Sequence, residues 1–253
     1  MMERASRAEA LAHQTEAAHD PLVFLGAVLR TQSDVARHVE SIELSGVLGR
    51  DVTRVLPSMR AILHTIADRA PELLADEARS REEEPEEVAI SRLAVYWAGD
   101  TTGRDDYISR ALLQPYVEVL RVRNTAPDRL HRRGHCPFCG GPPIVSARRS
   151  MPDAESGSRM LVCALCANEW NFNRVCCPSC FEERPDKLPV FTSDAHANVR
   201  IEACDTCRRY MKSIDLTKDA RPIPAVDDLL SIAMDLWAMD EGLTRVEVGL
   251  AGV

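Results

Sequence analysis

Nine cysteines are the residues of this sequence best suited to chemistry, and all of them lie between positions 136 and 207. Twenty-three residues separate the second Cys-x-x-Cys pair from the first, and twenty-three separate the fourth from the third. Residues 136–166 and 177–207 therefore form a tandem repeat with a period of 41. The repeat contains four pairs: Cys136/Cys139, Cys163/Cys166, Cys177/Cys180 and Cys204/Cys207.

A Cys-x-x-Cys turn points both sulfurs toward one centre, and two such turns together supply four thiolates in a tetrahedron. Soft sulfur ligands in that geometry select zinc or iron. A single pair is also compatible with a redox motif, but four pairs in two equal repeats favour metal binding over redox thiols or disulfides. We expect two metal ions per chain, one for each repeat, with every paired cysteine as a ligand.

The spacing fits two ways of joining the pairs. Sequential ribbons would join the first pair to the second and the third to the fourth, whereas an interleaved arrangement would join first to third and second to fourth. The segment MPDAESGS (151–158) has turn-forming residues between the candidate strands PIVSARR and RMLVCAL. This predicted hairpin favours the sequential arrangement.

One cysteine is surplus in the run RVCCPSC (174–180), because only Cys177 keeps the repeat in register with Cys180. If residues 174–177 are extended, Cys176 and Cys177 point to opposite faces. We expect Cys176 to be a small buried apolar side chain rather than a ligand, with a reactive surface thiol as the alternative.

Histidine could replace a sulfur ligand, but eight well-spaced cysteines leave little need for it. The histidines in or near the cysteine region are His131, His135 and His196. The remaining histidines have no partner at ligand spacing and are expected to be surface or structural residues: His13, His19, His38 and His64.

The first 130 residues contain no cysteine and read as a helical bundle without a catalytic motif. One helix is predicted to begin at Asp20-Pro21, and a second to be capped by Ser58, with Met59, Ile62, Leu63 and Ile66 as its apolar face. Pro71 is expected to open a third helix. Residues 79–87, RSREEEPEE, are expected to form a solvated connection, since like charges this dense repel. Further helices are predicted over 88–97 and 105–123, with Pro115 as a kink or a start.

The end of the chain carries one more amphipathic helix, which begins near Pro224 and Asp227 and includes Leu236 and Trp237. We expect core packing for it rather than partner binding. The predicted organisation is a helical domain (1–132), a first four-cysteine module (133–171), a second four-cysteine module (172–218), and a segment (219–253) whose helix packs back on the helical domain.

The composition of the 253 residues limits where the protein acts and what it binds. Its hydrophobic content of 45% is ordinary, and no apolar run is long enough for a membrane span. The first twenty residues have no apolar core of an export signal, so we expect a cytoplasmic protein with reduced thiols. The net charge of −8 argues against nucleic acid as a partner.

Several segments together resemble the formate dehydrogenase accessory protein family FdhE over about residues 135–242. They are CPFCGGPP (136–143), LVCALCANEWNFNRVCCPSC (161–180), EACDTCRRYMK (202–212) and the C-terminal DDLLSIAMDLWAMDEG (227–242). The resemblance implies a multidomain fold of α plus small β: an N-terminal all-α helical bundle, two tandem rubredoxin-like or zinc-ribbon modules with sequential pairing, and a C-terminal helix.

The same resemblance implies a function. It implies a maturation factor without catalytic activity, which binds the catalytic subunit of a molybdenum or tungsten formate dehydrogenase. It also implies iron rather than zinc, held by Cys136, Cys139, Cys163 and Cys166 in one site and by Cys177, Cys180, Cys204 and Cys207 in the other.

The sequence departs from a common knuckle pattern, in which glycine follows the second cysteine because φ is positive there. Only Gly140 fits this pattern; the other positions hold Ala167, Phe181 and Arg208. Positive φ at such a residue costs on the order of 1 kcal/mol, which metal-binding energy offsets.

Two other functions remain as alternatives at this stage. Zinc ribbons often bind nucleic acid, and the basic run RLHRRGH (129–135) supports that function, although aromatic stacking residues are few. A rubredoxin-like electron-transfer protein would need iron and an exposed site. The sequence leaves open the metal in each site, the client-binding surface and the oligomeric state, homo-oligomers included.

Overall fold

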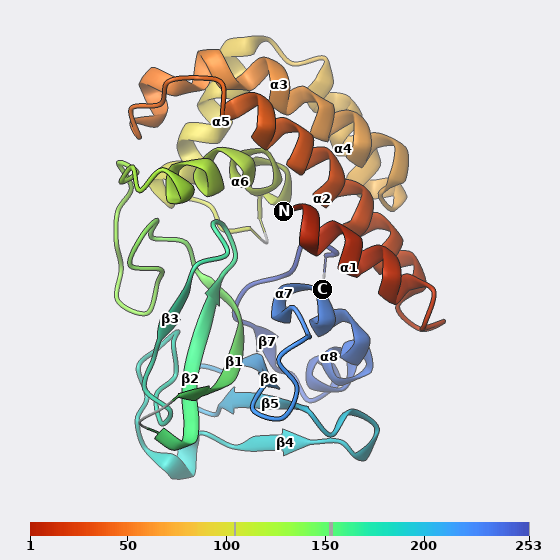
Figure 1. Cartoon of the computed structure of the whole chain (residues 1–253), viewed down its shortest axis with the longest axis vertical. Helices are drawn as coiled ribbons and strands as arrows, with labels where there is room; N and C mark the ends of the chain where they lie inside the picture. Colours follow the sequence, from red (N-terminus) through yellow and green to blue (C-terminus); the bar gives the residue numbers. More distant parts are fainter. Residues whose placement is uncertain (104, 152–153, 253) are drawn as a thin grey trace. The chain divides into compact units, whose positions relative to one another are not determined.

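A helical unit and a sheet-containing unit make up the chain in the computed structural model (Figure 1). The structure describes residues 1–103, 105–151 and 154–252. Residues 1–14, 19–130 and 250–252 belong to the helical unit, and residues 15–18 and 131–249 belong to the sheet-containing unit. None of the helices in these ranges is long and apolar enough to cross a lipid bilayer.

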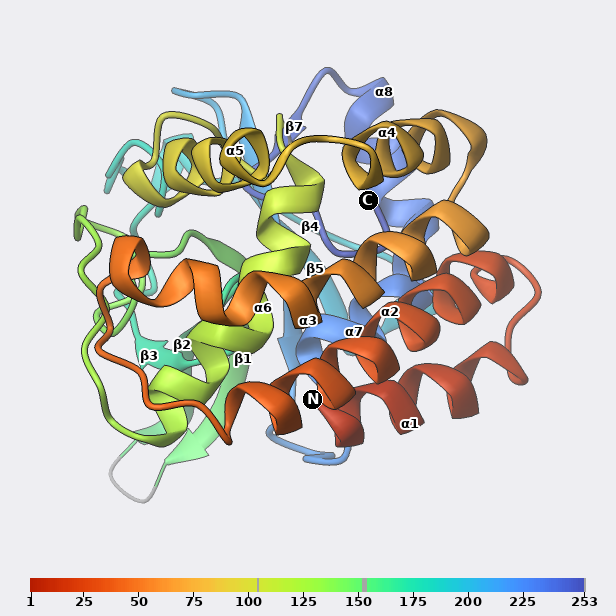
Figure 2. The ribbon, with the colours of Figure 1, turned by 90° about the horizontal axis from the view of Figure 1, so that it is seen from above.

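The helical unit is built from helices of very different length, with α1, α2 and α3 lying side by side (Figure 2). Helix α6 packs on α2 and α3 and is buried from Ile108 to Leu120. The bounds are α1 (Met2–Ala12), α2 (His19–Val39), α3 (Leu48–Arg69), α4 (Glu72–Glu82), α5 (Glu86–Ala98) and α6 (Tyr107–Val122). The fold class predicted for this part of the chain is confirmed.

Helix α3 begins earlier than predicted and continues through a proline because its apolar face is continuous. Met59, Ile62 and Ile66 are fully buried on one face, as predicted. The helix does not begin at Ser58, however: it begins at Leu48 and runs through Pro57. The Ser58 hydroxyl instead donates to the Val55 carbonyl. The apolar face continues on both sides of the proline, so its burial outweighs the one backbone hydrogen bond that proline removes.

The charged run 79–87 is largely exposed, as expected, but most of it is helical. Helix α4 ends at Glu82 and α5 begins at Glu86. Arg81 is buried and pairs with Glu77, one turn earlier, and with Asp106, the N-cap of α6, at 2.8 Å. Both carboxylates that pair with Arg81 lie outside the run, so the arginine adds a positive charge beside the acidic residues that follow it and reduces their mutual repulsion.

The sheet-containing unit holds one mixed sheet, in the order β3-β2-β1-β6-β5-β4, with β7 also paired to β6. Its strands are β1 (Pro143–Met151), β2 (Ala154–Cys163), β3 (Glu169–Asn171), β4 (Val190–Thr192), β5 (Val199–Cys204), β6 (Arg209–Asp215) and β7 (Thr244–Arg245). Strands β1 and β2 form the predicted antiparallel hairpin. Part of its predicted turn, residues 152–153, lies outside the described residues.

The two cysteine modules share this sheet, because β1 of the first pairs in parallel with β6 of the second over residues 146–148 and 213–215. Their buried side chains form one cluster that includes Val145, Ala147, Ile201 and Ile214. Two separate modules were predicted. A ribbon of this size cannot bury a core alone, and joining the sheets lets both use the same one.

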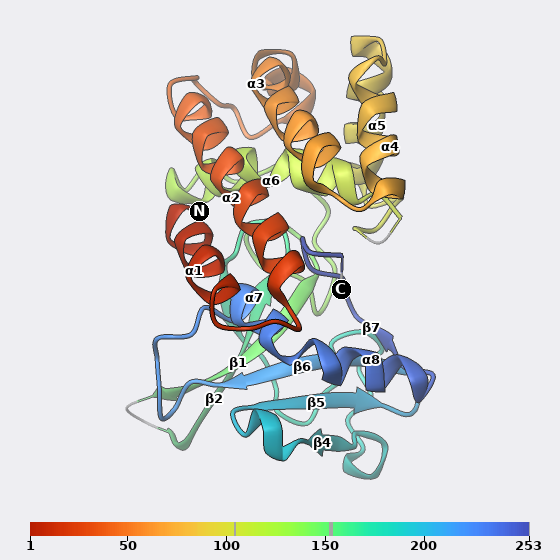
Figure 3. The ribbon, with the colours of Figure 1, turned by 90° about the vertical axis from the view of Figure 1, so that its right-hand side faces the viewer.

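The C-terminal helices also belong to this unit (Figure 3). They are α7 (Pro224–Asp227), the 3-10 turn η3 (Asp228–Ser231) and α8 (Ile232–Asp240). Met234 and Ala238 of α8 join the apolar cluster of the sheet. The apolar side of this helix therefore packs against the sheet of its own unit. Its predicted packing on the helical domain stays a prediction.

Candidate metal centres

Each Cys-x-x-Cys pair sits in a tight turn closed by backbone hydrogen bonds. In the first, the Gly140 N–H donates to the Cys136 carbonyl, and the Cys136 N–H donates to the Gly141 carbonyl, both at 2.9 Å. The third turn repeats this pattern, with Phe181 donating to Cys177 at 3.0 Å and Cys177 to Glu182 at 2.9 Å. These bonds hold both cysteine side chains of a pair on the inside of the turn.

The residue after the second cysteine has positive φ in every one of the four turns. The values are 66° at Gly140, 55° at Ala167, 62° at Phe181 and 56° at Arg208. The left-handed conformation is therefore imposed by the turn even where glycine is missing. Arg208 has compensating contacts, since its guanidinium donates to the Glu241 carbonyl at the end of α8 and its own carbonyl accepts from Thr244.

The turns bring the sulfurs together as two groups of four, with the sulfurs of each group within 4.8 Å of one another. In the first group the Cys136–Cys166 and Cys139–Cys163 sulfurs are 3.6 and 3.4 Å apart. The equivalent pairs of the second, Cys177–Cys207 and Cys180–Cys204, are 3.7 and 3.5 Å apart. The groups join the first pair to the second and the third to the fourth, which is the sequential arrangement.

These distances fit a tetrahedral thiolate centre. Metal–sulfur bonds of about 2.3 Å place tetrahedral sulfurs about 3.8 Å apart. The backbone N–H groups of Leu165 and Cys166 point at the Cys163 sulfur, at 3.3 and 3.4 Å. Such donors stabilise a thiolate. Each group of four cysteines could therefore hold one metal ion.

The pKa shifts of the cysteine thiols in the first group are also compatible with a bound cation. Hydrogen bonds from the Cys139, Cys163 and Cys166 thiols lower the pKa of Cys136. Burial, together with hydrogen bonds to the neighbouring sulfurs, raises the pKa of Cys163 well above its usual value. Four buried sulfurs cannot all be thiolates without a cation to balance them, so a bound divalent metal would displace the remaining protons.

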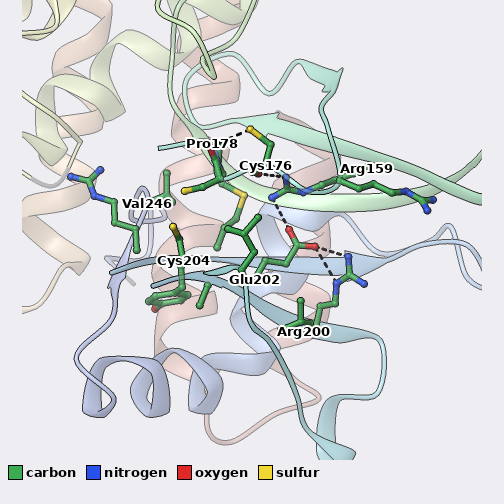
Figure 4. Close-up of a pocket in the computed structure, with 15 residues that line it drawn as sticks. Arg159, Cys176, Pro178, Arg200, Glu202, Cys204 and Val246 are labelled. Carbon is green, nitrogen blue, oxygen red and sulfur yellow. Dashed lines mark hydrogen bonds and ion pairs between the residues drawn. The ribbon is translucent and has the colours of Figure 1, made fainter. Parts of the chain in front are cut away.

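Cys176 lies outside both groups and is 4% exposed. Figure 4 shows it beside Arg159, whose guanidinium donates to the Cys176 carbonyl at 2.9 Å and pairs with Glu202 at 2.7 Å. Burial raises the pKa of the Cys176 thiol, which favours its protonated form. The expectation of a buried bystander agrees with this environment.

The 41-residue period is also a period of the structure. Strands β2 and β3 pair Leu161 with Trp170, and β5 and β6 pair Glu202 with Met211, which are the same positions one period later. The neighbouring ladder partners are related in the same way. The two cysteine groups are thus equivalent in strand register as well as in spacing.

The histidines near the cysteines do not contribute to either group of potential metal ligands among the described residues. His131 makes a hydrogen-bonding contact from its Nε2 to the Phe138 carbonyl at 3.2 Å.

Sequence reasoning missed two supporting residues. Arg159 is 4% exposed and links β2, the segment before Cys177 and β5. Asn168 points its side-chain amide at the Cys136 sulfur, at 3.7 Å. The available signal for Arg159 was its place at the start of the strand-forming run RMLVCAL, whose other residues are all apolar. No pattern in the sequence marked Asn168.

The fold and the two tetracysteine groups define a metal-binding protein with two zinc-ribbon-like sites on one sheet, attached to a helical domain. Comparison with known families gives the next step. Residues 135–174 match the model of "FdhE, central domain", and residues 175–250 match that of "FdhE, C-terminal domain". Over residues 135–250, which hold all eight paired cysteines, the chain is similar to the FdhE family.

Individual relatives show the same similarity. A protein FdhE homolog of Aquifex aeolicus is 36% identical over 140 residues, which cover 55% of this chain and 49% of that protein. The chain thus spans about half the length of that relative. A protein FdhE homolog of Pectobacterium carotovorum is 28% identical and is matched over 85% of its length and 96% of this chain.

A solved structure shares the fold. The crystal structure of the FdhE protein from Pseudomonas aeruginosa superposes with a TM-score of 0.69, covering 99% of this chain and 94% of the other. The sequence identity is 22%, so this likeness concerns the fold.

Proposed function

We propose that this protein is a maturation factor that binds the catalytic subunit of a molybdenum or tungsten formate dehydrogenase in the cytoplasm and assists its assembly or activation. The observation that carries the proposal is the similarity to the FdhE family over the whole cysteine region. In this proposal the chain has no catalytic turnover of its own.

Two metal ions belong to the proposal, one held by Cys136, Cys139, Cys163 and Cys166, and one by Cys177, Cys180, Cys204 and Cys207. The family resemblance favours iron, and zinc fits the same ligands. When bound, the ions fix the shape of the turns, so that short rigid loops are presented to the client. The chain's own contribution is the sheet that sets the spacing of the turns.

The test is co-purification with the formate dehydrogenase catalytic subunit, comparing the intact protein with a Cys163→Ser variant. We expect the intact protein to retain the client and the variant to lose much of it, because loss of one ligand disorders the first centre. A Cys176→Ser variant is the matched control and is expected to behave like the intact protein.

Other outcomes would redirect the proposal. Equal client binding by the intact protein and Cys163→Ser would refute the structural role of the metal. Tight binding of duplex DNA without client association would favour a nucleic-acid-binding function instead. Elemental analysis of anaerobically purified protein, with its absorption spectrum, decides between iron and zinc.

A further inference from the structure

The structural repeat allows each position around the first centre to be compared with the equivalent position around the second. Gly141 corresponds to Glu182, and Leu165 corresponds to Thr206, one period of 41 residues later. Gly141 and Leu165 are buried, whereas Glu182 is half-buried and Thr206 is exposed. The residues that cover the two sets of sulfurs therefore differ in polarity and in exposure.

The first centre is sealed by its own turns. Its four cysteines are at most 3% exposed, and the Leu165 side chain is fully buried. A Cβ atom at position 141 would lie 2.8 Å from the Cys163 sulfur and 3.0 Å from the Leu165 Cβ. Only glycine leaves room for the leucine to close against the sulfurs, so an apolar cover without access for water results.

The second centre has a polar cover that reaches the surface. Cys180 is exposed and Cys207 is partly exposed, while Cys177 and Cys204 are 4% and 1% exposed. The Thr206 hydroxyl donates to the Glu182 carboxylate at 2.6 Å. The exposed guanidinium of Arg184 donates to the same carboxylate. Hydrogen bonds at an exposed site exchange readily with water, so this cover does not exclude soluble molecules.

We infer that the second centre is the faster-exchanging one: its metal ion is accessible to soluble thiols and small chelators through Cys180 and Cys207, whereas the first centre releases its ion much more slowly. The inference rests on the proposed function in that both centres bind metal. In the exchange, a donor atom of the incoming thiol or chelator replaces the sulfur of Cys180 or Cys207, and the released thiolate takes up a proton. The number of metal ligands is conserved and no electron is transferred.

The experiment follows metal release from the full-length zinc-loaded protein with excess 4-(2-pyridylazo)resorcinol, a coloured chelator. We expect two phases of about one equivalent each, separated by at least about tenfold in rate, because ligand access limits exchange. Pulse alkylation with N-ethylmaleimide followed by mass spectrometry identifies the centre that opens. Label is expected first on Cys180 and Cys207.

Two reciprocal variants exchange the covers. Thr206→Leu should slow the fast phase toward the slow one, and Leu165→Thr should accelerate the slow phase. A single release phase, or first labelling within residues 136–166, would overturn the inference, as would unchanged rates in Thr206→Leu. Client binding is measured separately: loss of client binding with two-phase release intact contradicts the proposed function only, and failure to load any metal contradicts both.

Discussion

A single residue decides the register of the second centre. Cys176 and Cys177 are adjacent and both buried, yet only the Cys177 sulfur lies with those of Cys180, Cys204 and Cys207. We expect Cys177→Ser to lose about one metal ion per chain, because three thiolates bind a tetrahedral metal far less tightly than four. Cys176→Ser should retain both ions. Metal analysis after gel filtration measures the two variants, and an empty centre in Cys176→Ser would contradict the assignment.

The grouping of the cysteines could be predicted from the sequence because spacing is a property of the chain alone. The 41-residue period selected Cys177 over Cys176, and a hairpin between the first two pairs favoured the sequential grouping that the structure shows. The contacts of Arg208 could not be predicted in the same way. Its positive φ follows from the turn, but its bond to the Glu241 carbonyl depends on where α8 packs.

At the scale of elements, the attachment of α8 to the sheet is unusual because it is ionic as well as apolar. The Lys212 side chain of β6 is fully buried and donates to the Asp228 carbonyl at 2.7 Å. It also pairs with the carboxylates of Asp228 and Asp235, which Arg245 of β7 contacts as well. The two cations and two anions form a closed cluster between the strands and the C-terminal helices.

Lys212→Met is expected to destabilise the sheet-containing unit by about 3–5 kcal/mol, since it leaves two buried carboxylates with Arg245 as their one remaining cation. Amide hydrogen exchange of β5 and β6 in the metal-loaded protein measures the effect. Lys218→Met is the matched control, because Lys218 is exposed, and surface substitutions usually change stability by less than about 0.5 kcal/mol. Equal protection in both variants would refute a stabilising role for the cluster.

This cluster also explains why the position of the C-terminal helix was difficult to predict. The helical spacing of apolar residues indicates a helix with one buried face but does not say which element covers that face. The deciding residues, Lys212 and Arg245, are charged and lie on strands outside the helix. Their burial is a tertiary property, and charged residues are ordinarily expected at the surface. The same limit applies to Arg81 of the charged run, whose pairing with Asp106 on another helix is also a tertiary property.

For the whole molecule, we expect the two units to depend on metal to different degrees. The core of the helical unit consists of apolar side chains such as Leu22, Leu29, Ile62 and Ile108, and no cysteine occurs in the first 135 residues. The sheet-containing unit has one small apolar cluster and two tetracysteine groups. Structural zinc in small folds contributes roughly 10–16 kcal/mol, so removal of both ions takes away a large part of what stabilises this sheet.

Complete metal removal should therefore unfold residues 131–249 and leave helices α1 to α6 folded. Limited proteolysis of the chelator-treated full chain is expected to cut within 131–249 and to leave a protected fragment that ends near residue 130. Circular dichroism at the helical minimum should fall only in part. Restored protection after metal is returned would show that the loss is reversible. If the whole chain were cut at the same rate, the two units would unfold as one cooperative unit. If the sheet resisted cleavage, its shared apolar cluster would be sufficient to keep it folded without metal.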